Sequence, residues 1–236
     1  MPNYVKNTTY PGLFDLLAPH SCRGCGHIGN VLCDRCKKYI LNTRTNLCPI
    51  CKNPNPTGVC QACTKNSAIE PLPSTFIINE RTDLLDDLIH ALKYQSIRSL
   101  AKPLAELMNA ALPSFGSLVY IVPLPTISRH IRARGLDHTL LIAKQLAKLR
   151  PYFKIAKLLT RQNNTVQVGT DAKTRIAQAN SAYSISTHAI INPSATYILL
   201  DDVWTTGASL RSATKKLQQA GVNDITLAIL ALSRIN

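Results

Sequence analysis

The sequence contains eight cysteines, and all of them lie between positions 22 and 63 in four pairs of the form Cys-x-x-Cys. The pairs are Cys22/Cys25, Cys33/Cys36, Cys48/Cys51 and Cys60/Cys63. Two such pairs can surround one zinc ion tetrahedrally, with Zn–S distances of about 2.3 Å. Eight thiolates therefore predict about two structural zinc ions, and we expect the cysteine-bearing segment to need metal to fold.

Other uses of these cysteines are less consistent with the chain. A disulfide-linked module is typical of exported proteins, but the N-terminus has no basic-then-apolar signal pattern. Nothing distinguishes one pair as a redox centre among four equal pairs. Sequential sharing of metal, first pair with second and third with fourth, closes the shortest loops and costs the least entropy. Crossed sharing is the alternative.

The cysteines stop before Glu70-Pro71-Leu72-Pro73, where regular apolar patterning begins. We therefore expect a small module at 1–70 and a larger domain at 71–236. In the larger domain, apolar strand-like runs alternate with helical patterns, which predicts a parallel sheet covered on both faces, with ligands at the carboxyl ends of strands. The expected strands are 75–78, 118–122, 155–159, 197–200 and 225–232, and the expected helices are 82–94, 100–112, 140–149, 171–182 and 209–220.

No stretch approaches the roughly 20 uncharged apolar residues that a membrane span needs. The longest candidate runs only from Ile225 to Leu232. From the sequence we therefore expect a cytoplasmic protein without a membrane span.

A second motif follows the apolar run from Tyr197 to Leu200. Asp201 and Asp202 come directly after it, and a loop of hydroxyl side chains and one glycine then enters a helix. Free N–H groups of such a loop and helix start bind phosphate, while the carboxylates suit a sugar diol or water-held Mg²⁺. The motif predicts a ribose 5-phosphate site, the alternative being a plain strand end and helix cap. The expected phosphate-binding residues are Thr205, Thr206, Gly207, Ala208 and Ser209.

This segment resembles the phosphoribosyl pyrophosphate (PRPP) signature of type I phosphoribosyltransferases. The whole chain resembles the ComF family of competence proteins, including its GntX-like branch. The resemblance rests on the cysteine pairs, Leu92-Lys93-Tyr94, Val122-Pro-Leu-Pro125, Arg132-Ala-Arg134-Gly135, Gln167 with Arg175, and the PRPP signature.

The resemblance implies a double zinc ribbon ahead of a phosphoribosyltransferase-like domain. It places Asp201 and Asp202 on ribose hydroxyls, residues 205–209 around the 5-phosphate, and Mg²⁺ with PRPP. Candidates for the pyrophosphate are Arg129, Arg132, Arg134 and Gly135.

The chain departs from the family after Arg134-Gly135, where it has Leu136-Asp137-His138 in place of the usual Phe-Asn-Gln. A carboxylate is poorly suited to touch pyrophosphate, so we expect Asp137 to orient Arg134 or His138. His138 itself is expected to be a surface or hydrogen-bonded histidine. Lys93 has two equal interpretations, as a family site residue or as a cation that complements a helix dipole.

The chain is strongly basic, with 27 Lys and Arg against 13 Asp and Glu and a formal charge of +14. Residues 129–161 hold nine of these cations and one acid, or +8. One pyrophosphate accounts for two or three arginines, so the remainder predicts a surface for a polyanion, with a solvated helix face as the alternative. The candidate DNA-binding residues are Lys144, Lys148, Lys154 and Lys157.

Three functions follow from the resemblance. The favoured one is a competence protein that binds PRPP with Mg²⁺ and handles single-stranded DNA in the cytoplasm during natural transformation. The second is an active phosphoribosyltransferase that acts on an unidentified acceptor. The third is a zinc-ribbon adaptor for a DNA-uptake helicase or other competence proteins.

Overall fold

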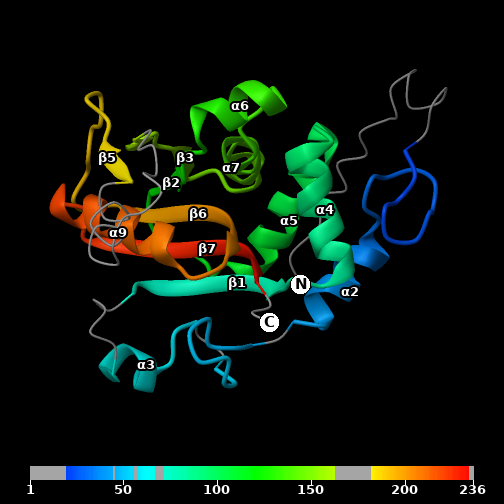
Figure 1. Cartoon of the computed structure of the whole chain (residues 1–236), viewed down its shortest axis with the longest axis horizontal. Coiled ribbons are helices and arrows are strands. Elements are labelled where there is room, and N and C mark those ends of the chain that lie inside the picture. Colours follow the sequence, from blue (N-terminus) through cyan, green and yellow to red (C-terminus); the bar gives the residue numbers. More distant parts are fainter. Residues whose placement is uncertain (1–19, 45, 56–57, 67–71, 163–181, 234–236) are drawn as a thin grey trace, which may run out of the picture.

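The structure is a computed structural model, and it describes residues 20–44, 46–55, 58–66, 72–162 and 182–233. Its centre is a five-stranded sheet in the order β1-β7-β6-β2-β3, in which every neighbouring pair is parallel (Figure 1). The strands are β1 (Ser74–Glu80), β2 (Val119–Pro123), β3 (Phe153–Ile155), β6 (Thr196–Trp204) and β7 (Asp224–Leu232).

The two faces of the sheet carry separate apolar cores, as the alternation of side chains along a strand requires. On β6, Ile198 and Leu200 belong to the core under helices α4 (Asp83–Tyr94), α5 (Ala101–Ala111) and α7 (His138–Leu149). Tyr197 and Leu199 belong to the opposite core, which includes α9 (Ala208–Gln219). Burial on both faces explains the continuous apolar strands, and the predicted fold class is confirmed.

One predicted strand is wrong in its position. The run at 155–159 is not a single strand, because β3 ends at Ile155 and a separate strand β4 (Leu159–Arg161) begins after a loop. Strand β4 pairs antiparallel with β5 (Tyr183–Ile185) in a small second sheet. The helix predicted at 171–182 lies, apart from Ala182, outside the described residues, as do Gln167 and Arg175.

Helix boundaries follow local capping chemistry. The side chain of Thr82 accepts a hydrogen bond from the N–H of Leu85 and caps α4, which lies within the helix expected at 82–94. Helix α5 follows a short 3-10 turn, η1 (Arg98–Leu100). The basic segment after β2 contains an unpredicted helix, α6 (Ser128–Arg134), which ends at Gly135 with a left-handed φ of 68°.

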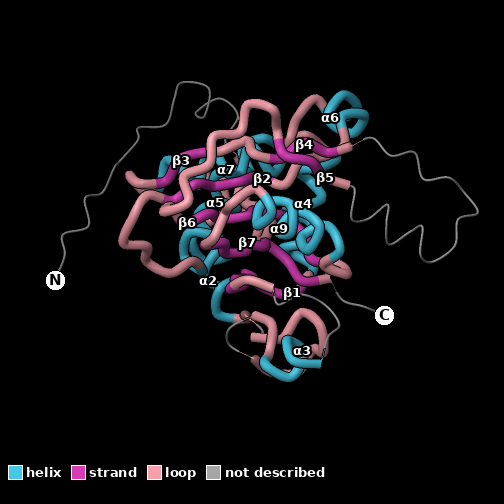
Figure 2. The backbone as a smooth tube through the Cα atoms, turned by 90° about the vertical axis from the view of Figure 1, so that its left-hand side faces the viewer, coloured by secondary structure: helices cyan, strands magenta, loops and turns pink. Residues whose placement is uncertain are grey.

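The cysteine-bearing segment packs directly on the sheet domain. Helix α2 (Asp34–Asn42) places Ile40 in the same core as α4 and α5, and Lys37 Nζ lies 2.6 Å from Glu106 Oε2. The side chain of Asn79 on β1 donates to the Ile40 carbonyl at 2.8 Å. The C-terminal half of the cysteine-bearing segment, which includes α3 (Gln61–Asn66), lies beside the edge strand β1 (Figure 2). A domain boundary near residue 70 therefore stays a prediction.

No helix in the described part of the chain is both long and apolar enough to cross a membrane.

Candidate functional site

The eight cysteines form two clusters of four. Cys22, Cys25, Cys33 and Cys36 make the first, and Cys48, Cys51, Cys60 and Cys63 make the second, with all sulfurs of a cluster within 4.8 Å of one another. The Sγ atoms of Cys25 and Cys33 are 3.6 Å apart, and those of Cys51 and Cys60 are 3.7 Å apart. A tetrahedron with Zn–S bonds of about 2.3 Å has edges of about 3.8 Å. Both clusters therefore fit zinc, and the sequential sharing of pairs is confirmed.

The backbone of each cluster is arranged to stabilise thiolates. The N–H of Cys33 donates to Cys22 Sγ at 3.3 Å, and the N–H of Cys60 donates to Cys48 Sγ at 3.4 Å. Burial opposes ionisation of Cys22, but such N–H donors lower its pKa to about 6. Burial and the neighbouring thiols instead raise the pKa of Cys36 to about 12. Four crowded thiols cannot all ionise alone, so a bound divalent cation is what balances the cluster.

A polar cavity of about 250 Å³ opens at the carboxyl ends of β2 and β6. This is the edge of a parallel sheet at which ligands bind. The wall combines two acids with lysine, arginine and histidine side chains from four elements. The lining residues are Lys93, Leu124, Pro125, Thr126, Ile127, Arg134, His138, Thr139, Arg161, Asp201, Asp202 and Ser209.

The two acids at the end of β6 face opposite sides of the sheet. Asp202 has the same strand parity as Ile198 and Leu200, and its carboxylate meets Lys93 from α4 and His138 from α7. The Nζ of Lys93 is 2.6 Å from Asp202 Oδ2, and His138 Nε2 contacts the same oxygen. Asp201 has the parity of the opposite core and is half-buried. The two acids are therefore not equivalent partners of one diol.

The carboxyl groups of Asp201 and Asp202 also differ in protonation, because their surroundings differ. Burial, together with the neighbouring Asp202 charge, raises the pKa of Asp201 to about 8. Burial would also raise the pKa of Asp202, but the hydrogen bond from His138 and the charge of Lys93 hold it well below its usual range. At neutral pH the pair therefore carries close to one negative charge, located on Asp202.

A divalent cation does not fit directly between these acids. Asp202 Oδ2 is already contacted by Lys93 and His138, and Asp201 Oδ1 accepts the N–H of Asp202 at 2.8 Å. Mg²⁺ demands near-octahedral oxygen ligands and repels a neighbouring ammonium group. The acid pair is thus already in contact with a lysine and a histidine of the protein itself.

The loop after β6 enters α9 as predicted, but only part of it reaches the cavity. Ser209 lines the cavity, whereas Thr205, Thr206, Gly207 and Ala208 are not among its lining residues. Gly207 has a left-handed φ of 73°, and a Cβ there would lie 2.6 Å from the ring of buried Trp204. Close packing on Trp204, and not only approach to a phosphate, therefore requires glycine at this position.

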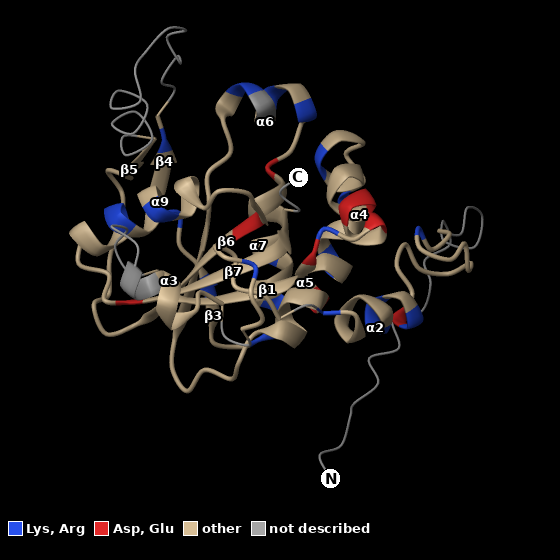
Figure 3. Cartoon of the chain, turned by 60° about the horizontal axis from the view of Figure 1, so that its bottom comes forward, with Lys and Arg blue, Asp and Glu red and all other residues tan. Residues whose placement is uncertain are grey.

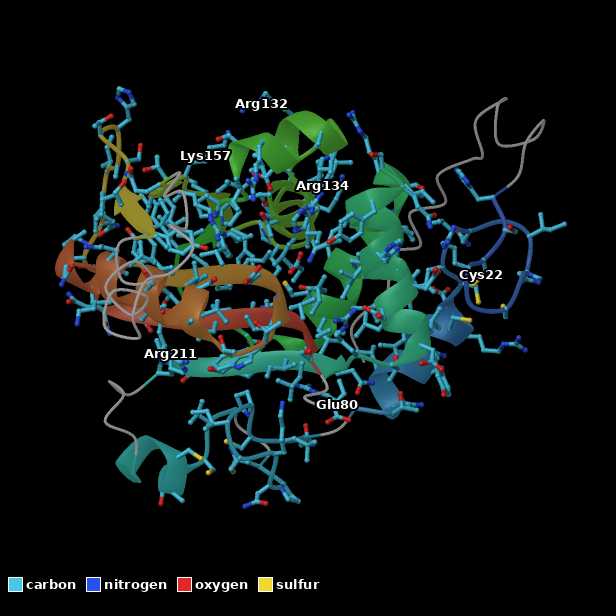
Figure 4. The ribbon with its side chains drawn as sticks, viewed as in Figure 1. Cys22, Glu80, Arg132, Arg134, Lys157 and Arg211 are labelled. Carbon is cyan, nitrogen blue, oxygen red and sulfur yellow. The ribbon has the colours of Figure 1, made fainter. Side chains whose placement is uncertain are left out.

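Of the three candidate arginines, the structure brings only Arg134 to the cavity. Its guanidinium lies 4.6 Å from the centre of the Tyr94 ring. Ser96 Oγ donates to the Arg134 carbonyl at 2.9 Å, and Arg98 donates to the Gly135 carbonyl at 2.9 Å. Neither Arg129, Arg132 nor Gly135 lines the cavity. Figure 4 shows Arg132 on the outer side of α6 and Arg134 nearer α4.

Asp137 does not orient Arg134 or His138 in the way that we expected. Its Oδ1 accepts from the N–H of Leu140 at 3.2 Å and from the Thr139 hydroxyl at 2.8 Å. Asp137 is therefore the N-cap of α7. Helix capping is therefore the role that the structure shows for Asp137. His138 does not lie at the surface: it is deeply buried, and its Nε2 contacts Asp202 Oδ2.

Two polar residues that line the cavity were not among the site residues expected from the sequence. Arg161 comes from β4, donates to the Tyr183 hydroxyl at 3.0 Å and lies 5.3 Å from the centre of that ring. The Thr139 hydroxyl lies 3.0 Å from the Leu124 carbonyl oxygen, a second acceptor beside Asp137 Oδ1. Arg161 was counted only within the basic segment, and its pairing with Tyr183 spans 22 residues. No local spacing in the sequence signals such a pair.

The four candidate DNA-binding lysines are all exposed, but they do not share one flat face. Lys144 and Lys148 lie one turn apart on the outer side of α7. Phe153 packs in the core under α7, so the alternation of β3 turns Lys154 to the other face of the sheet. Lys157 follows β3 (Figure 4). The lysines therefore come from α7, from β3 and from the loop after β3. Figure 3 shows the dispersed blue residues.

Comparison with known proteins gives one match over most of the sequence. The chain is 27 % identical over 221 residues to Competence protein F of Haemophilus influenzae, covering 89 % of this chain and 94 % of that protein. No family model matches the sequence.

Two solved structures show a distant likeness to the fold. One is described as the allosteric regulatory enzyme of purine biosynthesis, with 14 % identity and a TM-score of 0.36, covering 55 % of this chain and 25 % of that chain. The other is a hypoxanthine phosphoribosyltransferase from Staphylococcus aureus, with 14 % identity and a TM-score of 0.32, covering 60 % of this chain and 69 % of that chain. The chain thus spans a quarter of the length of the first protein.

The long match to Competence protein F, together with two four-cysteine clusters ahead of a parallel sheet, agrees with the resemblance of the chain to the ComF family.

Proposed function

We propose that the cavity binds a ribose 5-phosphate ligand of the PRPP class. The observation that carries the proposal is the meeting of Asp201 and Ser209 with two arginines, Arg134 and Arg161, around one cavity at the carboxyl end of β6. A ligand with a diol between two anionic groups matches this order of charges.

In this arrangement the 5-phosphate lies at the start of α9, beside Ser209 and Arg161. The helix N-terminus and its hydroxyls favour a phosphate there. Asp201 serves the ribose diol, and its raised pKa lets the neutral carboxyl both donate and accept a hydrogen bond. Arg134 serves the pyrophosphate, and Mg²⁺ enters as the counter-ion of that group.

The ligand test uses calorimetric titration with PRPP and with ribose 5-phosphate. Replacing Arg134 by glutamine is expected to weaken PRPP binding by about 10–100-fold, the value of a lost hydrogen bond to a charged group. Ribose 5-phosphate affinity should change far less, because it lacks the pyrophosphate. The matched control, Arg132→Gln, removes a charge from the same helix outside the cavity.

Equal losses in the two variants, or no binding of either sugar phosphate by the natural chain, would contradict the assignment. Incubation with PRPP and a panel of nucleobases, with detection of released pyrophosphate, separates an active transferase from a binding protein. In the described part of the cavity we assign no residue to an acceptor, so we favour binding.

We further propose that the chain handles single-stranded DNA in the cytoplasm during DNA uptake, alongside a helicase or other competence proteins. The supporting observation is the exposed pair Lys144 and Lys148 on α7, followed along the chain by exposed Tyr152 and Lys154 at β3. Cations that follow a backbone, with an aromatic ring for stacking, are typical of single-strand binding.

The DNA test is charge reversal of Lys144 and Lys148 to glutamate. We expect binding of a labelled single strand to weaken at least about tenfold at low salt. The log–log salt slope should become shallower by about 0.7 for each lost phosphate contact. Anisotropy measurements should include the variant with Lys38→Glu and Lys102→Glu, which changes net charge equally at two other exposed lysines. Similar losses of DNA affinity in both variants would show that net charge alone accounts for the effect.

A further inference from the structure

We propose that Lys93 takes the place of a divalent metal ion at the acid pair of β6, so that the ribose end of the cavity binds its ligand without metal. The proposal rests on the proposed function for its ligand, but its metal part can be tested without any sugar phosphate.

The position of Lys93 separates its two sequence interpretations. It lies in the last turn of α4, where a lysine that only complements the helix dipole extends into solvent. The Lys93 side chain is instead only 18 % exposed, lines the cavity, and ends 2.6 Å from Asp202 Oδ2. Buried Leu88 and Leu92 fix the same helix against the core, so the ammonium group is held in place.

One oxygen of each acid is already in contact with another group of the protein. Asp202, with a side chain 7 % exposed, receives Lys93 and His138 on a single oxygen. Asp201 Oδ1 accepts the N–H of Asp202. A hard cation at this point would displace Lys93 or lie beside its charge, and both are unfavourable in a site with little solvent.

The charge of the acid pair is also balanced without a metal ion. Asp201 with its raised pKa is largely neutral at pH 7, and Asp202 is balanced by Lys93. Among the residues that the structure describes, the other Lys, Arg, Asp or Glu side chains that line the cavity are Arg134 and Arg161, and their positive charges further disfavour a dication. Lys93 is thus a positioning residue that fixes Asp202 and leaves Asp201 to the ligand.

Removing the ammonium group should create a metal site. In Lys93→Met, whose side chain has similar length and no charge, Asp202 loses its balancing cation beside Asp201. We expect the zinc-loaded natural protein to bind no Mn²⁺ at this position by electron paramagnetic resonance. Lys93→Met should bind one Mn²⁺, and the further change Asp201→Asn should remove it. Lys93→Arg keeps the charge and should behave as the natural protein.

The ligand readout uses ribose 5-phosphate, which has no pyrophosphate to carry Mg²⁺. Its affinity for the natural protein should change less than twofold between chelator and millimolar Mg²⁺, whereas Lys93→Met should gain at least tenfold from Mg²⁺. Mn²⁺ bound to the natural protein and lost on Asp201→Asn would overturn the proposal, as would a Lys93→Met chain without metal response. If Lys93→Met does not fold, Lys93→Gln and the natural protein supply the same comparison. Absence of sugar phosphate binding would refute the proposed function alone, because the Mn²⁺ result stands without it.

Discussion

Replacing Cys36 by serine is expected to lower the melting temperature of the whole protein by at least about 10 °C and to remove one of about two zinc ions. Cys22 and Cys36 are buried in the same apolar core as Leu85 and Leu88 of α4. Zinc binding in structural sites is worth about 10–16 kcal/mol in isolated peptides. In a chain of this size each 1 kcal/mol shifts Tm by about 2–4 °C. Calorimetry and metal analysis of the purified protein measure both effects.

The second cluster supplies the matched control, Cys51→Ser. Of the described residues, no cysteine of this cluster belongs to either apolar core. Loss of its zinc should release the segment next to β1 while the sheet still melts cooperatively at a smaller reduction in Tm. Equal shifts in the two variants would show that the packing of the first cluster on α4 and α5 contributes nothing to the stability of the sheet. The sequence predicted a separate small module that needs metal to fold, because the sequence reveals no contact between that module and the sheet.

The second large effect concerns Asp201, whose replacement by asparagine is expected to stabilise the ligand-free protein increasingly from about pH 5 to pH 8. Its pKa of about 8 in the folded state exceeds the ordinary value of about 3.9. A raised pKa gives the folded state an advantage that is present at low pH and lost as pH rises toward the folded value. Each pH unit in that window costs up to about 1.4 kcal/mol. Urea unfolding at a series of pH values measures the difference between the two proteins.

The substitution Asp202→Asn, at the adjacent position, is expected to change the stability of the protein in the opposite direction. The pKa of Asp202 is lowered in the folded state, so its contribution is present at neutral pH and is lost only as pH falls below about 4. Removing this charge leaves Lys93 and His138 without their carboxylate, and loss of one partner of a buried pair costs about 3–5 kcal/mol. Asp202→Asn should therefore destabilise the protein where Asp201→Asn stabilises it. The same direction of change in both variants would show that the acids are equivalent.

The effect of Asp201 on stability also bears on ligand binding. The Asp201 carboxyl group lowers the stability of the folded protein at pH 7–8, yet the chain carries it at the wall of the cavity. Such a cost is typical of groups that serve a ligand and not the fold. Titration of the Asp201→Asn chain with ribose 5-phosphate therefore belongs beside its unfolding curves. A more stable chain with weaker binding is the expected combination.

Much of the fold could be predicted from short-range patterns. The Cys-x-x-Cys pairs predict their own metal clusters, because two residues of spacing and short loops bring the sulfurs together. The apolar run before Asp201 predicts β6, and Thr82 predicts the start of α4, because strand burial and helix capping depend on neighbours in the chain. Strand β4 was misplaced, since a three-residue strand carries too little pattern to separate it from β3.

The sequence by itself determined the metal clusters, the alternation of strands and helices, and the strand end that carries two acids and a hydroxyl loop. Only the tertiary structure decided that Asp202 belongs to Lys93 and His138, that Arg134 rather than Arg129 or Arg132 enters the cavity, and that Arg161 joins it. The reason is physical. Local patterns arise from backbone geometry over a few residues, whereas Lys93 and Asp202 are 109 positions apart and meet only because α4 and β6 pack in one core. Which charge neutralises which is therefore set by packing.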